Sequence, residues 1–87
     1  MTEADLFQLD FTRINETAEN SGAPNDWYYY TYDVGSFCLI SPSSDEVKND
    51  EWYVEIFESN TIRFTSRTEL EIFMTLLINN YREDDSI

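Results

Sequence analysis

Carboxylates are the most abundant reactive side chains in this 87-residue sequence. It has 18 Asp and Glu residues against 5 Lys and Arg, and its formal net charge is −13. It contains no His, so the usual general base and the commonest metal ligand are both missing. The lone cysteine, Cys38, and the serines have no recognisable partners for a nucleophilic triad. Paired carboxylates serve glycosidases, but so short a chain leaves little room for a sugar cleft. We therefore expect no catalysis and no cofactor.

Calcium is the best metal candidate for the densest run of oxygen ligands, which comprises Asp45, Glu46, Asn49, Asp50 and Glu51. Their spacing does not match an EF-hand loop, and the central glycine of such a loop is missing. We interpret this run as a solvated loop and predict no metal site, with a weak surface cation site as the alternative. Gly22 and Gly35 are too far apart to form a phosphate-binding loop.

The net charge restricts the class of partner. Phosphates and anionic membranes would be repelled, so we expect neither direct nucleic-acid binding nor membrane association. A basic protein is the favoured partner, and charge that serves only solubility is the alternative. The −13 net charge equals that of about 22 Å of B-DNA duplex. The sequence shows no signal peptide, no stretch long enough to span a bilayer and no cysteine pair, which favours a cytoplasmic protein.

The elements that must position these side chains are clearest in the aromatic segment 27–40. Residues 27–32 are almost all aromatic, a short break contains Gly35, and residues 37–40 are again apolar. This pattern predicts a β-hairpin whose turn uses the left-handed conformation open to glycine. Strand alternation places Tyr28, Tyr30 and Tyr32 on one side and Trp27, Tyr29 and Thr31 on the other.

The segment before the hairpin has two interpretations. Thr2 and Asp5 resemble a capping box, and a stripe of apolar residues at helical spacing follows, so we favour a helix over residues 3–19. The alternative is a strand, because Phe7, Leu9 and Phe11 alternate with polar residues.

The second half of the chain predicts two further strands and a helix. Trp52, Val54 and Ile56 alternate in a strand over residues 52–57, and a turn at residues 59–60 leads into a strand over residues 61–64. Ser66 and Glu69 form a capping box for a broadly apolar helix over residues 67–82. We predict one α+β domain, residues 1–87, that has an antiparallel sheet of three to four strands with an N-terminal and a C-terminal helix (α-β-β-β-β-α).

One side of the tyrosine strand is expected to meet the last helix. The other side is either covered by the first helix or is the aromatic centre of a protein-binding surface, in which tyrosines anchor and carboxylates steer. The candidate partner-binding residues are Asp26, Tyr28, Tyr30, Tyr32, Asp33, Asp45, Glu46, Asp50, Glu51, Tyr53, Glu55 and Glu58.

In size, charge and element order, the chain resembles the small acidic proteins by which phages and mobile elements block host nucleases. The closest class is the anti-CRISPR inhibitors of Cas9, some of which are acidic α+β domains that imitate DNA. The resemblance implies an inhibitor in the host cytoplasm that binds a basic groove and competes with nucleic acid. It includes no alignable motif, so it assigns no residue. The alternatives are a non-catalytic interaction module of immunity or adaptor type, binding through an aromatic sheet face, and a small hydrolase or metal-dependent enzyme.

Overall fold

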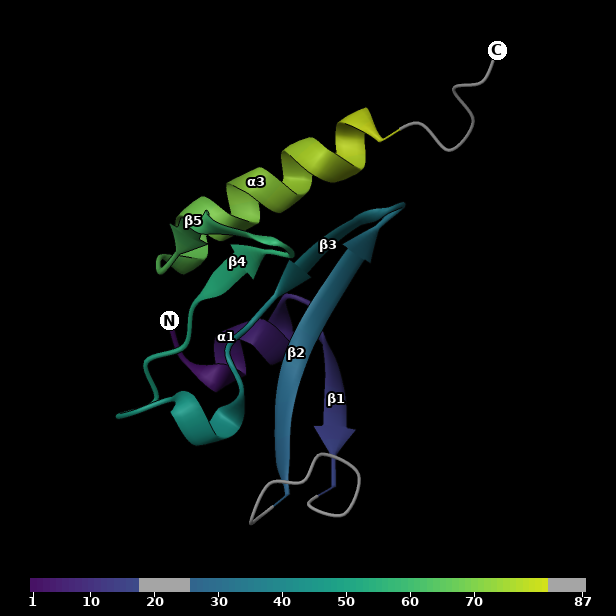
Figure 1. Cartoon of the computed structure of the whole chain (residues 1–87). Helices are drawn as coiled ribbons and strands as arrows, with labels where there is room; N and C mark the ends of the chain where they lie inside the picture. The colour runs from purple at the N-terminus through teal and green to yellow at the C-terminus, as the bar shows by residue number, and fades with distance from the viewer. Residues whose placement is uncertain (18–25, 82–87) are drawn as a thin grey trace.

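A computed structural model describes residues 1–17 and 26–81. It forms an antiparallel five-stranded sheet in the order β1-β2-β3-β4-β5, with a helix at each end of the described chain (Figure 1). The predicted α+β class is confirmed, with one strand more than expected. The elements are α1 (Glu3–Gln8), β1 (Thr12–Glu16), β2 (Trp27–Val34), β3 (Phe37–Ile40), the 3-10 turn η1 (Ser44–Glu46), β4 (Val54–Ile56), β5 (Ser59–Phe64) and α3 (Arg67–Asn80).

The extra strand comes from the segment predicted to be helical over residues 3–19. The capping box is present: the Asp5 amide donates to Thr2 Oγ1 and the Thr2 amide donates to Asp5 Oδ2. The helix prediction is wrong after Gln8, because Asp10 has a positive φ of 70° and β1 begins at Thr12. The β-branched residues of β1 suit a strand, and its five residues pair with β2. Residues 18 and 19 lie outside the described ranges.

The predicted aromatic hairpin is confirmed as β2 and β3. Val34 pairs with Phe37, so Gly35 and Ser36 form a two-residue turn. Gly35 has a φ of 62°, a conformation that costs little only for glycine. A Cβ atom at this position would also overlap the ring of Tyr81, which follows α3.

The strands of the second half are confirmed with shifted boundaries. The strand predicted over residues 52–57 shortens to β4, because the Trp52 amide donates instead to the Met1 carbonyl oxygen, at 2.8 Å. The predicted turn at residues 59–60 is wrong by two positions. The chain turns at Phe57 and Glu58, where Glu58 has a φ of 67°, and β5 therefore begins at Ser59 instead of Thr61.

Serine side chains extend the pairing of β2 beyond the end of β3. The Tyr30 amide donates to Ser41 Oγ at 2.9 Å, and the Tyr28 amide donates to Ser44 Oγ at 3.1 Å. These hydroxyl groups replace the carbonyl oxygens of a strand, so the backbone of β2 stays hydrogen-bonded where the chain has become a loop. They also hold η1 beside the start of β2.

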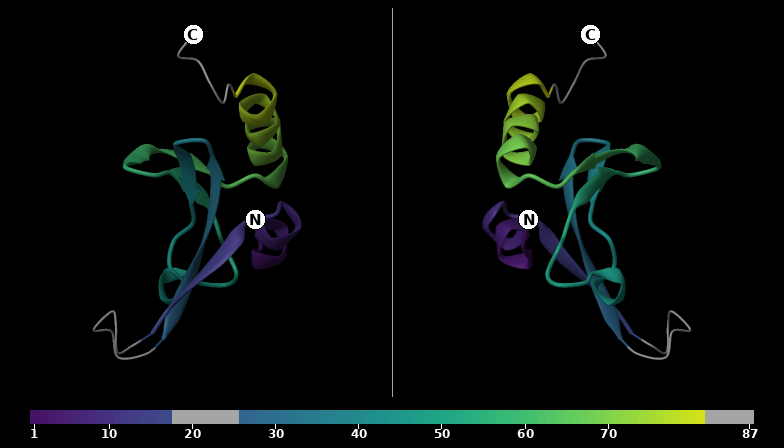
Figure 2. Two further views of the ribbon diagram at one scale, coloured as in Figure 1. Left: turned by 90° about the vertical axis from the view of Figure 1, so that its right-hand side faces the viewer. Right: turned by 90° about the vertical axis from the view of Figure 1, so that its left-hand side faces the viewer.

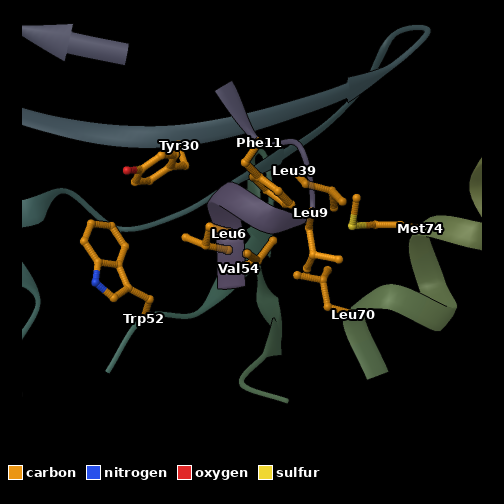
Figure 3. Close-up of a cluster of buried hydrophobic side chains, with 9 residues drawn as sticks. All are labelled: Leu6, Leu9, Phe11, Tyr30, Leu39, Trp52, Val54, Leu70 and Met74. Atoms are coloured by element: carbon orange, nitrogen blue, oxygen red, sulfur yellow. The ribbon is translucent and has the colours of Figure 1, made fainter. Parts of the chain in front are cut away.

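Both helices pack against the same face of the sheet (Figure 2). One buried cluster joins them to it and consists of Leu6, Leu9, Phe11, Tyr30, Leu39, Trp52, Val54, Leu70 and Met74 (Figure 3). The predicted C-terminal helix is confirmed, and the Ser66 hydroxyl accepts from the Glu69 amide at its start. The predicted end at residue 82 is two residues too late, since α3 ends at Asn80. No helix within the described ranges is long and apolar enough to cross a membrane.

Candidate protein-binding face

The alternation along β2 separates its aromatic residues into two environments. Tyr28, Tyr30 and Tyr32 point towards the helices and contact the core. Trp27 and Tyr29 lie on the opposite face, which neither helix covers (Figure 2). The predicted contact of one side of this strand with the last helix is met only at the end of β2, where Val34 lines a hollow with residues of α3, whereas Tyr28 and Tyr30 hydrogen-bond to Glu3 of α1.

The inward tyrosines are tied to the first helix through Glu3. The Tyr30 hydroxyl donates to Glu3 Oε2 at 2.6 Å, and the Tyr28 hydroxyl donates to Glu3 Oε1 at 3.2 Å. Tyr30 is only 4% exposed, and burial, reinforced by Glu3, raises its pKa to about 12. Burial also raises the pKa of Tyr28. Tyr30 is thus a core residue, whereas Tyr28 and Tyr32 are partly buried against the same core.

The opposite surface, here called the outer face, is an aromatic and aliphatic patch. The strand register places Ile14 beside Tyr29 and Thr31 beside Ile40. The rings of Trp27 and Tyr29 stack with their centroids 5.6 Å apart. All of these side chains are half-buried, although no helix lies over them. The outer face comprises Ile14, Trp27, Tyr29, Thr31, Cys38 and Ile40.

Carboxylates border the outer face. Glu16 pairs with Trp27 at one end of β2, and Asp33 pairs with Cys38 roughly 20 Å away at the other. Glu55 pairs with Ile40, but its carboxylate is bound by Arg63 at 2.9 Å, which neutralises it locally. The same guanidinium lies 3.9 Å from the centroid of the Tyr53 ring. Tyr53 and Glu55 are therefore already engaged with Arg63.

More carboxylates gather where β2 begins. Asp26 directly precedes Trp27, and the bond from the Tyr28 amide to Ser44 brings the exposed Asp45 and Glu46 of η1 to the same end. A hollow of about 340 Å³ lies here, with Glu16, Asp26 and Trp27 among its lining residues. Arg13 also lines it, with its guanidinium 3.7 Å from the centroid of the Tyr28 ring. We call the set Glu16, Asp26, Asp45 and Glu46 the acidic end.

The other predicted acidic residues lie elsewhere. Asp50 Oδ1 accepts from the Glu3 amide at 3.2 Å, at the start of α1, so it belongs to the helical side. Glu51 is exposed in the loop before Trp52, and Glu58 is exposed in the turn between β4 and β5. The predicted set therefore divides. Asp26 lies at the start of β2 and Asp45 and Glu46 lie in the adjoining η1. Glu46 and Glu51 together line a hollow of about 510 Å³, and Asp50 and Glu58 lie elsewhere.

The outer face offers recognition chemistry more readily than covalent chemistry. Burial, with a contribution from Asp33, raises the pKa of the Cys38 thiol to about 11, so this thiol is protonated at neutral pH. In the part of the chain that the structure describes, no group of three or more His, Cys, Asp or Glu side chains is placed to hold a metal ion. The interactions that this surface can offer a partner are ring stacking on Trp27 and hydrogen bonding to the carboxylates.

The predicted binding residues include none of the six residues of the outer face and not Glu16. Glu16 and Ile14 were assigned to the first helix, and their pairing with β2 became visible only with β1. Trp27 was correctly placed on the face opposite Tyr28, but the tyrosine-rich face was taken as the binding side. The Thr-x-Ile alternation at Thr12 and Ile14 was the available signal for the strand.

Comparison of the chain with protein-family models, with characterised proteins and with solved structures finds no significant match.

Proposed function

We propose that the protein is a non-catalytic acidic binder that occupies a basic surface of a nucleic-acid-binding protein, such as a nuclease, and competes there with nucleic acid. The observation that carries the proposal is the uncovered outer face, whose Trp27–Tyr29 stack adjoins Glu16 and Asp26 of the acidic end. The host cytoplasm is the compartment in which such a competitor would act.

This pairing of groups suits arginine-rich surfaces. A guanidinium stacks on the face of an indole ring and donates forked hydrogen bonds to a carboxylate, and Trp27 lies beside both Glu16 and Asp26. Asp45 and Glu46 add negative charge at the same end of the sheet. Proteins that bind nucleic acid present basic side chains to phosphates, so the same side chains are available to these carboxylates.

The net charge acts over a longer range than these contacts. At −13 it accelerates encounter with a basic groove and repels nucleic acid from the complex. Charge thus supplies the association rate, while the stacked rings supply contact area that excludes water.

A panel of purified nucleic-acid-binding proteins tests the proposal. It includes a guide-loaded Cas9-type nuclease, whose heteroduplex channel is positively charged. Displacement of labelled duplex DNA is measured by fluorescence anisotropy as the protein is added. We expect at least one panel member to release its DNA, and displacement of none would refute the proposal.

Charge-matched variants separate the site from the net charge. The test variant carries Glu16→Gln, Asp26→Asn, Asp45→Asn and Glu46→Gln. The control removes the same number of charges from exposed positions elsewhere, through Asp10→Asn, Glu58→Gln, Glu69→Gln and Glu71→Gln. We expect displacement to be lost in the test variant and retained in the control. Equal loss in both would assign the effect to overall charge.

A second function is favoured by the apolar character of the outer face itself. Ile14, Tyr29 and Ile40 form a continuous patch across three strands, which fits an adaptor or immunity-type module whose charge serves only solubility. In that case Tyr29→Ala abolishes partner binding, and the test variant above binds as well as the unmodified protein.

A further inference from the structure

The first two strands hold an arginine between an aromatic ring and an oxygen acceptor. The Arg13 guanidinium lies 3.7 Å from the centroid of the Tyr28 ring, and its Nε atom donates to Asn15 Oδ1 at 2.9 Å. The strand register accounts for this, because Asn15 pairs with Tyr28 and Arg13 pairs with Tyr30, the next residue on the same face. A planar guanidinium can therefore stack on a ring while it donates to the acceptor opposite that ring.

The last two strands hold a second arginine with the same kinds of group. The Arg63 guanidinium lies 3.9 Å from the centroid of the Tyr53 ring, and its Nη2 atom donates to Glu55 Oε2 at 2.9 Å. A ring beside an oxygen acceptor is thus a combination that this sheet uses twice to bind a guanidinium.

The outer face repeats the first arrangement with one difference. One position further along the ladder, Glu16 pairs with Trp27 and Ile14 pairs with Tyr29. An oxygen acceptor again lies opposite a ring, but Ile14 occupies the position that corresponds to Arg13. Among the described residues, no Lys or Arg lies over the Trp27 ring or forms an ion pair with Glu16. The guanidinium that completes the arrangement on the other face has no counterpart in this part of the chain.

The surroundings of Trp27 select an arginine as the missing group. Glu16 and Asp26 both line the hollow of about 340 Å³, against the one positive charge of Arg13. Tryptophan gives the strongest cation–π contact of the aromatic side chains, and the Trp27 ring is supported by its stack with Tyr29. A lysine ammonium could meet the negative charge, but it is a point charge that neither stacks as a plane nor donates a fork of hydrogen bonds.

We propose that Trp27 and Glu16 bind an arginine side chain of the partner in preference to a lysine, which rests on the proposed function and names the group that the acidic end recognises. The guanidinium stacks on the Trp27 indole and donates to the Glu16 carboxylate, as Arg13 does with Tyr28 and Asn15 on the other face. Stacking of a cation on a partly exposed ring corresponds to about two- to fivefold in affinity.

Two short peptides that differ in one side chain test this preference. Acetylated and amidated Gly-Arg-Gly and Gly-Lys-Gly are titrated into the isotope-labelled protein at about 0.1 M NaCl and followed by nuclear magnetic resonance. The chain has two tryptophans, so its two indole N–H signals report on Trp27 and on the buried Trp52, and a Trp27→Phe variant assigns them. We expect the Trp27 signal to report about two- to fivefold tighter binding of the arginine peptide, with the Trp52 signal unmoved. Equal affinity for both peptides, or an unmoved Trp27 signal, would overturn the proposal.

An arginine supplied by the chain itself gives a second test. Ile14→Arg places a guanidinium at the position that corresponds to Arg13, where it should cover Trp27 and exclude the arginine peptide. Ile14→Lys adds the same charge and is the matched control, so it should weaken peptide binding less. Near-ultraviolet circular dichroism verifies that both variants keep the aromatic core. Equal weakening in the two variants would assign the effect to charge and contradict the stacking role of Trp27.

These measurements are independent of DNA displacement. A protein that displaces DNA from a panel member but binds both peptides equally would refute the arginine preference and leave the proposed function standing. A protein that prefers the arginine peptide but displaces no DNA would refute the proposed function and retain the arginine site.

Discussion

Glu3 links the first helix to the middle of the sheet through two phenol groups. Tyr30 is buried, and its hydroxyl donates to the Glu3 carboxylate. Without this hydrogen bond, the hydroxyl would lie unpaired in the core. Two rings pack against Trp52 in the same place, with centroid distances of 6.1 Å for Tyr28 and 5.5 Å for Tyr30. The residues that looked most like surface anchors in the sequence are therefore structural.

Removing the Glu3 carboxylate should destabilise the fold. In Glu3→Ala the Tyr30 hydroxyl loses its partner while it stays buried, which costs about 1–3 kcal/mol of unfolding free energy. Urea denaturation measures the change. Tyr30→Phe in the Glu3→Ala background should recover part of it, because the unpaired hydroxyl is then gone. If Glu3→Ala unfolds at the same urea concentration as the unmodified protein, the contact contributes nothing.

Cys38 should react slowly despite its place on the outer face. Its pKa of about 11, raised from 9.0, lowers the thiolate fraction at neutral pH by about 100-fold. The more basic thiolate is intrinsically about tenfold more nucleophilic, so alkylation should be about tenfold slower than that of a thiol with ordinary pKa. The rate with iodoacetamide, measured before and after unfolding in urea, tests this. Asp33→Asn should accelerate the folded-state reaction, since Asp33 contributes to the raised pKa.

At the scale of elements, the sequence predicted β2, β3, β4, β5, α3 and the start of α1, where local signals were strong. Capping residues mark the start of both helices, apolar periodicity marks α3, and the aromatic hairpin has its glycine at the turn. The segment after Gln8 was ambiguous, because the apolar positions of residues 7–14 fit both a helical stripe and, in part, a strand period. Residues 12–16 form a strand because they pair with β2, whose residues follow more than ten positions later in the sequence and so are not part of the local pattern.

Gly35 is the element-scale position most sensitive to substitution. Gly35→Ala forces a side chain into a positive φ, which costs about 1–2 kcal/mol, and places Cβ against the Tyr81 ring. Thermal denaturation of Gly35→Ala and of Gly35→Ala with Tyr81→Ala separates the two contributions. The double variant should recover only the steric part. Full recovery would show that the hairpin tolerates alanine in the turn.

For the whole molecule, the decisive arrangement is that both helices lie on one face of the sheet (Figure 2). The sequence separated the two sides of β2 correctly, because alternation is local. It could not determine which side would be covered, since that depends on where α1 and α3 pack. The covered side is the one with three tyrosines, so the surface that we propose for binding is the one with Trp27, Tyr29 and the acidic end.

The carboxylates that give the net charge of −13 differ in where they lie and in what they contact. Arg67 forms a salt bridge with Asp5, and Arg63 forms one with Glu55. Two of the five basic residues are therefore each paired with one carboxylate. Asp26, Asp45 and Glu46 lie with Glu16 at the end of the sheet where β2 begins. A basic side chain of a partner could therefore stack on the Trp27 ring and pair with a neighbouring carboxylate at the same position.

The proposal that the acidic end binds a basic surface is tested most directly by the salt dependence of binding to the panel protein whose DNA is displaced. Dissociation constants at about 0.1 M and about 1 M NaCl, compared for the unmodified protein and for the variant neutralised at the acidic end, isolate the contribution of these carboxylates. We predict that salt weakens the unmodified complex by on the order of tenfold or more, and the neutralised one far less. An affinity of the unmodified protein that is the same at both salt concentrations would contradict binding through the acidic end.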